Sequence, residues 1–164
     1  MSSAAPLVIE VLSSRHDRTP FDCGAPALNI FLKQYALQNQ KKQFVRTYVC
    51  CHNKKILGYY SLAFGETKRE SAPPILLKGA GKYPVPTMIL ARLAVDVSGQ
   101  GKGIGETLLK NAVMRIRQAA DIAGLRAIVV HAKDEKAQSF YAKYGFIVEE
   151  NNPLTMFFPM EFAL

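Results

Sequence analysis

The sequence predicts an α/β fold in which helices flank a mixed, mostly antiparallel sheet. Strand-like and helix-like segments alternate in the order strand, helix, three strands, helix, strand, helix and two strands. Residues 125–131 form a largely apolar run, which is typical of a strand covered on both faces. A chain of 164 residues is long enough for one domain with a core, so we expect residues 1–164 to form a single domain.

The first half of the chain is predicted to supply a helix, a hairpin and a long proline-rich connection. Strands are expected at residues 8–12, 44–51 and 56–64. A helix is expected over 26–39, where apolar residues recur every three or four positions, and Asn53–Lys55 reads as a turn. Residues 66–86 contain four prolines and predict a loop, either a flap beside the substrate site or a surface excursion.

The second half is predicted to alternate strands and helices. Strands are expected at residues 88–96, 125–131, 146–149 and 156–162. A helix is expected to run to Ala120 from Ile104, because it carries a buried stripe at helical spacing. Asp134 is expected to cap a further helix that stops at Gly145.

Charge and composition limit the possible functions. The chain carries 21 Lys and Arg against 13 Asp and Glu, a net charge of +8 that favours polyanions such as nucleic acid. A solvated surface with a phosphorylated cofactor explains the same charge. No secretory signal or membrane-spanning run is present in the sequence, so we expect a cytoplasmic protein. The three cysteines and three histidines lack zinc-ligand spacing, so no metal is expected.

The most informative stretch lies between a predicted strand and a predicted helix: Val95-Asp-Val-Ser-Gly-Gln-Gly-Lys-Gly-Ile-Gly105. A glycine turn that opens a helix aims backbone N–H groups and the positive helix end at one point, which favours phosphate. The dinucleotide pattern G-x-G-x-x-G fails, because its third glycine falls on Ile104 or Glu106. The Walker A pattern fails because Gly103 follows Lys102. The pattern that remains is Q-x-x-G-x-G.

A second motif follows later in the chain: Ala137-Gln-Ser-Phe-Tyr-Ala-Lys-Tyr-Gly-Phe146. One predicted strand, residues 125–131, lies between the helix expected from Ile104 and this motif. Together the two motifs resemble the GNAT acetyltransferase superfamily. The first resembles its pyrophosphate loop, and the second resembles the helix along the thiol arm of the cofactor. The resemblance implies one N-acetyltransferase domain with the GNAT fold. It also implies an enzyme that uses acetyl-CoA and needs no metal.

The resemblance also implies roles for individual residues. Tyr141 would protonate the leaving thiolate, and a backbone N–H near Leu93–Val95 would stabilise the oxyanion. The cofactor would contact Leu93, Ala94, Val95, Gln100, Gly101, Lys102, Gly103, Ile104, Gly105, Ser139 and Phe140. By aromatic spacing, Phe140 and Phe146 are expected in the core, with Tyr141 pointing about 100° away around the helix. Glu66 is a candidate general base, although a poorly basic amine needs none.

Segments outside the cofactor motifs resemble GNAT toxins of bacterial toxin–antitoxin pairs. They are residues 21–24, 28–33, 39–40, 46–49, 58–62, 90–96 and 130–132. Members acetylate the α-amine of aminoacyl-tRNA and so block translation. The resemblance implies an aminoacyl-tRNA substrate, a ribbon-helix-helix antitoxin, a homodimer and no membrane partner.

Four basic residues are candidates for tRNA contact. Lys33, Lys41 and Arg46 gather around the end of the first long helix and the next strand, although each alone is also explained as a solvated cation. Arg92 shares a strand face with apolar residues, so we expect it to hold a tRNA phosphate or to pair with a carboxylate. A GNAT enzyme for a small-molecule or protein amine, and a non-enzymatic polyanion-binding module, are the alternatives. The two motifs and Tyr141 argue against the non-enzymatic binding module.

Overall fold

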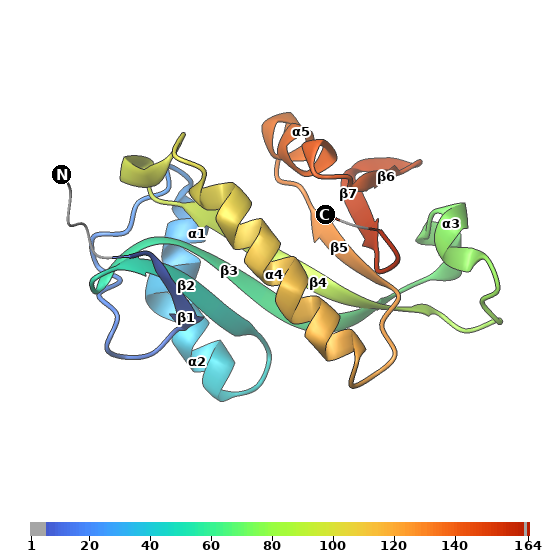
Figure 1. The fold of residues 1–164 in the computed structure, drawn as a ribbon, viewed down its shortest axis with the longest axis horizontal. Helices are drawn as coiled ribbons and strands as arrows, with labels where there is room; N and C mark the ends of the chain where they lie inside the picture. Colours follow the sequence, from blue (N-terminus) through green and yellow to red (C-terminus); the bar gives the residue numbers. More distant parts are fainter. Residues whose placement is uncertain (1–5, 163) are drawn as a thin grey trace. The chain divides into compact units, whose positions relative to one another are not determined.

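The computed structural model describes residues 6–162 and 164, and it contains a mixed sheet of seven strands in the order β1-β2-β3-β4-β5-β7-β6 (Figure 1). The strands are β1 (Val8–Val11), β2 (Arg46–His52), β3 (Lys55–Thr67), β4 (Val85–Val95), β5 (Ala127–His131), β6 (Ile147–Glu149) and β7 (Asn152–Pro159). The longer helices are α4 (Ile104–Ala120) and α5 (Glu135–Lys143). β4 pairs with β5 in parallel, and β1–β2, β2–β3, β5–β7 and β6–β7 are antiparallel. The predicted fold class is confirmed.

Two compact units make up the chain, one of residues 6–63 with 92–112 and the other of residues 64–91 with 113–162. The strands β3 and β4 and the helix α4 run through both units. That residues 1–164 act as one domain stays a prediction. Among the residues that the structure describes, no helix is long and apolar enough to cross a membrane.

In the first unit, one face of β3 is covered by the N-terminal helical segment. Tyr59 is fully buried, and its ring lies 5.6 Å from Phe21 and 6.4 Å from Phe31, centroid to centroid. Its hydroxyl donates to the carbonyl of Leu28 at 2.7 Å. The phenol therefore joins the strand to this segment through both apolar packing and a satisfied hydrogen bond.

The opposite face of β3 is covered by the first half of α4. Gly58 and Tyr60 point away from Tyr59, because side chains alternate along a strand. A Cβ on Gly58 would lie 2.8 Å from Cδ1 of Leu108, so only glycine allows this close approach. The hydroxyl of Tyr60 donates to Oδ1 of Asn111 at 2.6 Å.

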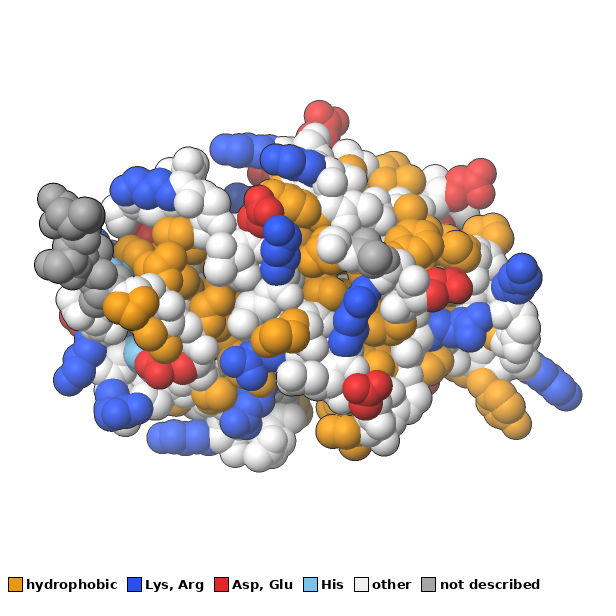
Figure 2. Space-filling model, in the orientation of Figure 1, with side chains coloured by type: hydrophobic (Ala, Val, Ile, Leu, Met, Phe, Trp, Pro, Cys, Tyr) orange, Lys and Arg blue, Asp and Glu red, His pale blue; other side chains and the backbone are white. Residues whose placement is uncertain are grey.

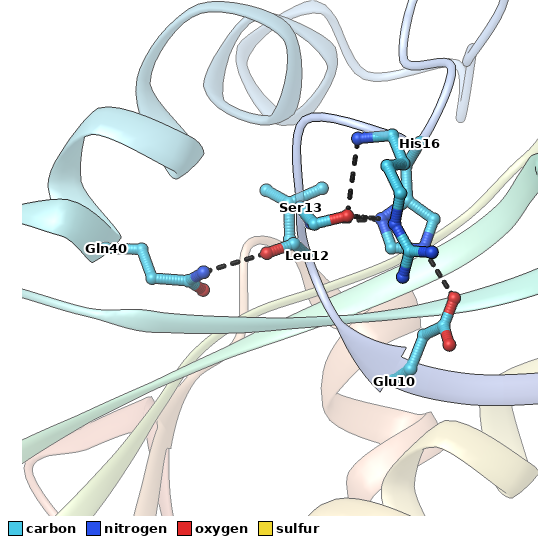
Figure 3. Close-up of polar contacts among 6 residues, drawn as sticks. Glu10, Leu12, Ser13, His16 and Gln40 are labelled. Atoms are coloured by element: carbon cyan, nitrogen blue, oxygen red, sulfur yellow. Dashed lines mark hydrogen bonds and ion pairs between the residues drawn. The ribbon is translucent and has the colours of Figure 1, made fainter.

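The N-terminal helical segment is longer than predicted and changes its winding. It consists of α1 (Pro26–Ile30), the π-helix η1 (Phe31–Tyr35) and α2 (Ala36–Lys41). Proline occupies the first turn, where its missing N–H costs nothing. Near the other end, Gln40 donates from Nε2 to the carbonyl of Leu12 at 2.9 Å (Figure 3). Its Oε1 accepts the N–H of Thr47, also at 2.9 Å.

In the second unit, a cluster of buried side chains forms the core between β5, β7 and the connection from β3 to β4. It comprises Leu76, Val85, Ala127, Val129 and Phe157. Residues 127–130 of β5 are all buried, as predicted for a strand covered on both faces. The predicted strand over 156–162 is displaced, because β7 runs from Asn152 to Pro159.

The prediction that residues 66–86 form one loop is wrong. β3 continues to Thr67, the 3₁₀ helix η2 (Arg69–Ser71) and α3 (Pro74–Leu77) follow, and β4 begins at Val85. Leu76 is buried, and the guanidinium of Arg126 donates to the carbonyls of Leu76 and Lys78. The prolines start a short helix here, which a loop prediction from proline content misses.

Candidate active site

The glycine-rich stretch forms a turn between β4 and α4 in the first unit. The 3₁₀ helix η3 (Val97–Gly99) is capped by Asp96, whose carboxylate accepts the N–H of Ser98 at 3.0 Å. Gly101 and Gly103 have φ angles of +77° and +82°, in the left-handed region that favours glycine. A Cβ on either would meet nothing within 4 Å, so the backbone conformation requires these glycines and the space beside them is open.

The start of α4 has the donors that a phosphate needs. The helix is 17 residues long, and the N–H groups of Ile104 and Gly105 lie in its first turn, where no intrahelical acceptor exists. Lys102 is exposed beside them, and the side chain of Ile104 is buried and anchors the turn. These groups fit the pyrophosphate of a nucleotide-bearing cofactor by charge and by exposed backbone.

Gln100 serves the turn in a way that the sequence did not predict. Its side-chain Nε2 donates to the carbonyl of Cys23 at 3.1 Å and to the carbonyl of Val95 at 2.9 Å. Both amide hydrogens are therefore used within the protein, rather than offered to the cofactor that Gln100 was expected to contact. Gln100 holds the turn against the segment that precedes α1.

Asp96 makes a second connection between the same two segments. Its Oδ1 accepts the N–H of Asp22 at 2.8 Å, and Val97 donates its N–H to the carbonyl of Asp22 at 2.7 Å. Burial acts to raise the pKa of Asp96, but hydrogen bonds from Ser98 and from the Asp22 backbone outweigh it, and the pKa lies below its ordinary value. Sequence reasoning gave Asp96 no role. Its cap on Ser98 is a local signal that could have found it, whereas its bond to Asp22, 74 positions away, is not.

Arg92 stacks on an aromatic ring. Its guanidinium carbon lies 3.6 Å from the centroid of Phe31, which is itself buried. Across residues 6–162 and 164, Arg92 forms no ion pair, so the predicted alternative of a carboxylate partner is wrong. The ring face offsets the cost of a half-buried charge and leaves the hydrogen-bond donors of the guanidinium for another partner.

In the second unit, the helix α5 carries Tyr141. Asp134 caps the helix by accepting the N–H of Ala137 at 2.9 Å, and Gly145 beyond its end has φ +95°, both as predicted. Tyr141 is only 8% exposed, whereas Phe140 is half-buried. The expectation that Phe140 is the core side chain and Tyr141 points away is therefore wrong. Helical spacing gives the angle between neighbours but not which of them faces the sheet.

The Tyr141 ring is held by two other aromatic rings and its hydroxyl keeps its proton. The ring centroids of Phe140 and Phe146 each lie 5.3 Å from that of Tyr141. Burial raises the pKa of Tyr141, so the phenol is protonated at neutral pH. Within the described part of the chain, its hydroxyl has no hydrogen-bond partner. A fixed, protonated and unengaged phenol is suited to donate a proton.

The remaining predicted residues occupy separate elements. Lys33 is half-buried in η1, Lys41 ends α2, and Arg46 begins β2. Ser139 on α5 and Glu66 on β3 are exposed. The parallel register of β4 with β5 runs from Thr87 to Ile89, and residues 93–95 lie beyond it on β4.

One further group of ligand-type side chains lies in the first unit. Donor atoms of Glu10, His16 and Cys51 lie within 4.8 Å of one another. The N–H of Ser13 donates to Nδ1 of His16 at 3.0 Å, so Nε2 carries the hydrogen. This Nε2 donates to Glu10 at 2.7 Å (Figure 3). Burial, with Glu10 and Cys50 adding to it, raises the pKa of the Cys51 thiol to about 12. A hydrogen-bonded pair beside a neutral thiol explains this group without a metal.

Comparison with known families assigns the class of the fold and the site. The profile of the acetyltransferase (GNAT) domain matches residues 43–148. The chain belongs to the GNAT acetyltransferase family, and its mixed seven-stranded sheet is the GNAT fold.

Within that family the chain is similar to toxins. It is 38% identical over 152 residues to the tRNA-acetylating toxin of Mycobacterium tuberculosis. The aligned residues cover 93% of this chain and 91% of that protein. The solved structure of AtaT complexed with acetyl-methionyl-tRNAfMet has a TM-score of 0.88 and 35% identity, and covers 95% of this chain and 96% of that one. A Tyr-to-Phe variant of AtaT, bound to the C-terminus of the antitoxin AtaR and to acetyl-CoA, has a TM-score of 0.83 and 33% identity, and covers 94% of each chain.

Proposed function

We propose that this protein is a toxin that transfers the acetyl group of acetyl-CoA to the α-amino group of aminoacyl-tRNA and so inhibits translation. The observation that carries the proposal is the open glycine turn at the start of α4, with Gly101 and Gly103 in the left-handed region. It is the anion site that acetyl-CoA requires, in a chain 38% identical to a tRNA-acetylating toxin.

Each part of the chain has a task in the transfer. The N–H groups from Gly101 to Gly105 hold the pyrophosphate, and acetyl-CoA supplies an activated thioester when bound. The substrate amine forms a bond to the carbonyl carbon, and the carbon–sulfur bond breaks. Tyr141 gives its hydroxyl proton to the departing sulfur, the amine loses one proton to solvent, and Tyr141 takes a proton back from solvent. Backbone N–H groups at residues 93–95 stabilise the negative charge on the carbonyl oxygen. Cofactor contacts by Ser139 and Phe140 on α5 belong to the same proposal.

The acceptor is argued from charge and from the chemistry of the amine. Arg92, Lys33, Lys41 and Arg46 are the proposed tRNA contacts, in a chain of net charge +8. The ester bond of aminoacyl-tRNA withdraws electrons from the α-amine, so much of it is neutral without a general base. AtaT in complex with acetyl-methionyl-tRNAfMet supports this acceptor.

Partners and location complete the proposal. The AtaT structure with the C-terminus of AtaR supports neutralisation by a cognate antitoxin. We infer that this antitoxin is of the ribbon-helix-helix type, that the toxin is a homodimer, and that it acts in the cytoplasm, where charged tRNA is found.

The test is incubation with labelled acetyl-CoA and total charged tRNA. The proposal predicts label on the amino acid that mild base releases from tRNA, and no label on deacylated tRNA. Labelling of a polyamine, an aminoglycoside or a peptide N-terminus, with charged tRNA unlabelled, would replace the proposal by the alternative of a small-molecule or protein acetyltransferase.

A further inference from the structure

The chain from Cys23 to Gly65 contains cations without a single carboxylate. It holds six Lys and Arg, namely Lys33, Lys41, Lys42, Arg46, Lys54 and Lys55, and no Asp or Glu. Basic side chains gather at the lower left of Figure 2, where Figure 1 places α2. Lys41, Lys42 and Arg46 are exposed, and none of them forms an ion pair among the residues that the structure describes.

A large aromatic side chain is exposed among these cations. Phe44, in the turn from α2 to β2, is 71% exposed. Its chain neighbours Lys42, Gln43 and Arg46 are exposed and polar, and Val45 is half-buried. A protein partner is usually met by an apolar patch of several residues. An exposed ring flanked in the chain by Lys41, Lys42 and Arg46 instead suits a nucleotide, because the base stacks on the ring while the phosphates meet the cations.

The turn holds Phe44 in a defined position. Gln43 has φ +67°, which is unusual for a residue other than glycine. The N–H of Phe44 donates to the carbonyl of Asn39 at 3.0 Å, and that of Gln43 to the carbonyl of Gln40 at 3.1 Å. The side chain of Gln40 in turn bridges Leu12 and Thr47, as Figure 3 shows for Leu12. The exposed ring therefore stands on a turn fixed from both sides.

We infer that Phe44 is a stacking platform for an unpaired base of the RNA substrate, whose neighbouring phosphates meet Lys41, Lys42 and Arg46. The inference rests on the proposed function and adds to it the ring that receives the base. Stacking on a protein aromatic ring changes the affinity for single-stranded nucleic acid by about 5- to 150-fold per base.

The chain has no tryptophan, so one introduced tryptophan reports on its own surroundings. Phe44→Trp places the reporter on the turn, and Tyr83→Trp is the matched control, because Tyr83 is an aromatic side chain that is 81% exposed in the connection before β4. Titration with deacylated total tRNA is expected to quench the fluorescence of Phe44→Trp, with weaker binding at higher salt, and to leave that of Tyr83→Trp nearly unchanged. Equal quenching of both, or of neither, would overturn the inference.

Affinity measurements separate stacking from charge and from folding. Phe44→Ala is expected to weaken binding of deacylated tRNA by about 5- to 150-fold, and Phe44→Tyr to keep it. Acetyl-CoA affinity and the thermal midpoint stay unchanged in both, because the ring is exposed. Phe44→Ala could instead bind tRNA normally but lose antitoxin binding or self-association. That result would assign Phe44 to a protein contact and overturn the inference.

The outcomes for the two proposals can be distinguished. If the unaltered chain acetylates charged tRNA while Phe44→Ala binds tRNA normally, the stacking platform fails and the proposed function stands. If the unaltered chain binds tRNA through Phe44 but acetylates none, the platform stands and the proposed function fails. Absence of tRNA binding by the unaltered chain overturns both.

Discussion

The carboxylate of Asp96 accepts the backbone N–H of Asp22 at 2.8 Å, although the two residues are 74 positions apart. With the bond from Gln100 to Cys23, it fixes the glycine turn to the segment that leads into α1. The proposed anion site and the helix that supplies Phe31 under Arg92 are thus joined within one unit. A cofactor site and a substrate site that share these connections are expected to respond together when one connection is cut.

Replacing Asp96 tests this connection. Asp96→Ala leaves the N–H groups of Asp22 and Ser98 without their acceptor, so the free energy of unfolding is expected to fall by about 3 kcal/mol. Acetyl-CoA affinity is expected to fall as well. Urea unfolding measures the stability, and titration calorimetry measures the affinity. Asp121→Ala, at an exposed position, is the control and should change neither. Unaltered stability of Asp96→Ala would show that the connection is dispensable.

The same carboxylate predicts how stability depends on pH. The pKa of Asp96 in the folded chain is lowered from 3.8, so its contribution is present above that pH and is lost as the pH falls through the folded value. Unfolding free energy is therefore expected to decline below about pH 4, and Asp96→Asn is expected to decline less steeply. Urea unfolding at several pH values measures both. Parallel curves would remove Asp96 from the acid response.

Gly103 tests the anion site directly. Gly103→Asp adds a negative charge where the pyrophosphate is proposed to bind, and it is expected to weaken acetyl-CoA binding by more than about tenfold relative to Gly103→Ala. Gly79→Asp is a matched control, because Gly79 also has a positive φ, +73°, and equally open space. It brings the same strain and charge to the turn after α3 and should leave acetyl-CoA affinity unchanged. Equal losses of acetyl-CoA affinity at both positions would show that the glycine turn is not the anion site.

Arg92 tests the substrate side. Arg92→Lys keeps the charge but loses the planar group that stacks on Phe31, so we expect kcat/KM for charged tRNA to fall by roughly tenfold. The dissociation constant of acetyl-CoA should stay the same. Arg15→Lys, at an exposed position, serves as the control. If acetyl-CoA binding falls in proportion to kcat/KM, Arg92 supports the fold rather than the substrate.

Local signals in the sequence predicted much of this fold and site. Three of these signals depend only on neighbours within a few residues: the glycine spacing at 99–105, the cap at Asp134 and the helix end at Gly145. Each is therefore predictable from the sequence alone. The order of strands and helices follows from their apolar periods.

Contacts between distant residues were not predictable in the same way. Gln100 and Asp96 each have one partner more than 70 positions away, Cys23 and Asp22, and no local pattern indicates either contact. The stacking of Arg92 on Phe31 is likewise tertiary. Which of Phe140 and Tyr141 is buried depends on where the sheet lies relative to α5, which a one-residue step around a helix leaves open.

Acetyl transfer to charged tRNA, measured for the unaltered chain and for Tyr141→Phe, tests the proposed reaction and its proton donor together. The variant keeps the ring between Phe140 and Phe146 and removes only the hydroxyl. We expect N-acetylated aminoacyl-tRNA from the unaltered chain, a rate about 10²- to 10⁴-fold lower for Tyr141→Phe, and the same acetyl-CoA affinity for both. If the unaltered chain leaves charged tRNA unacetylated, the proposed reaction is wrong, and if Tyr141→Phe keeps the full rate, Tyr141 is not the proton donor.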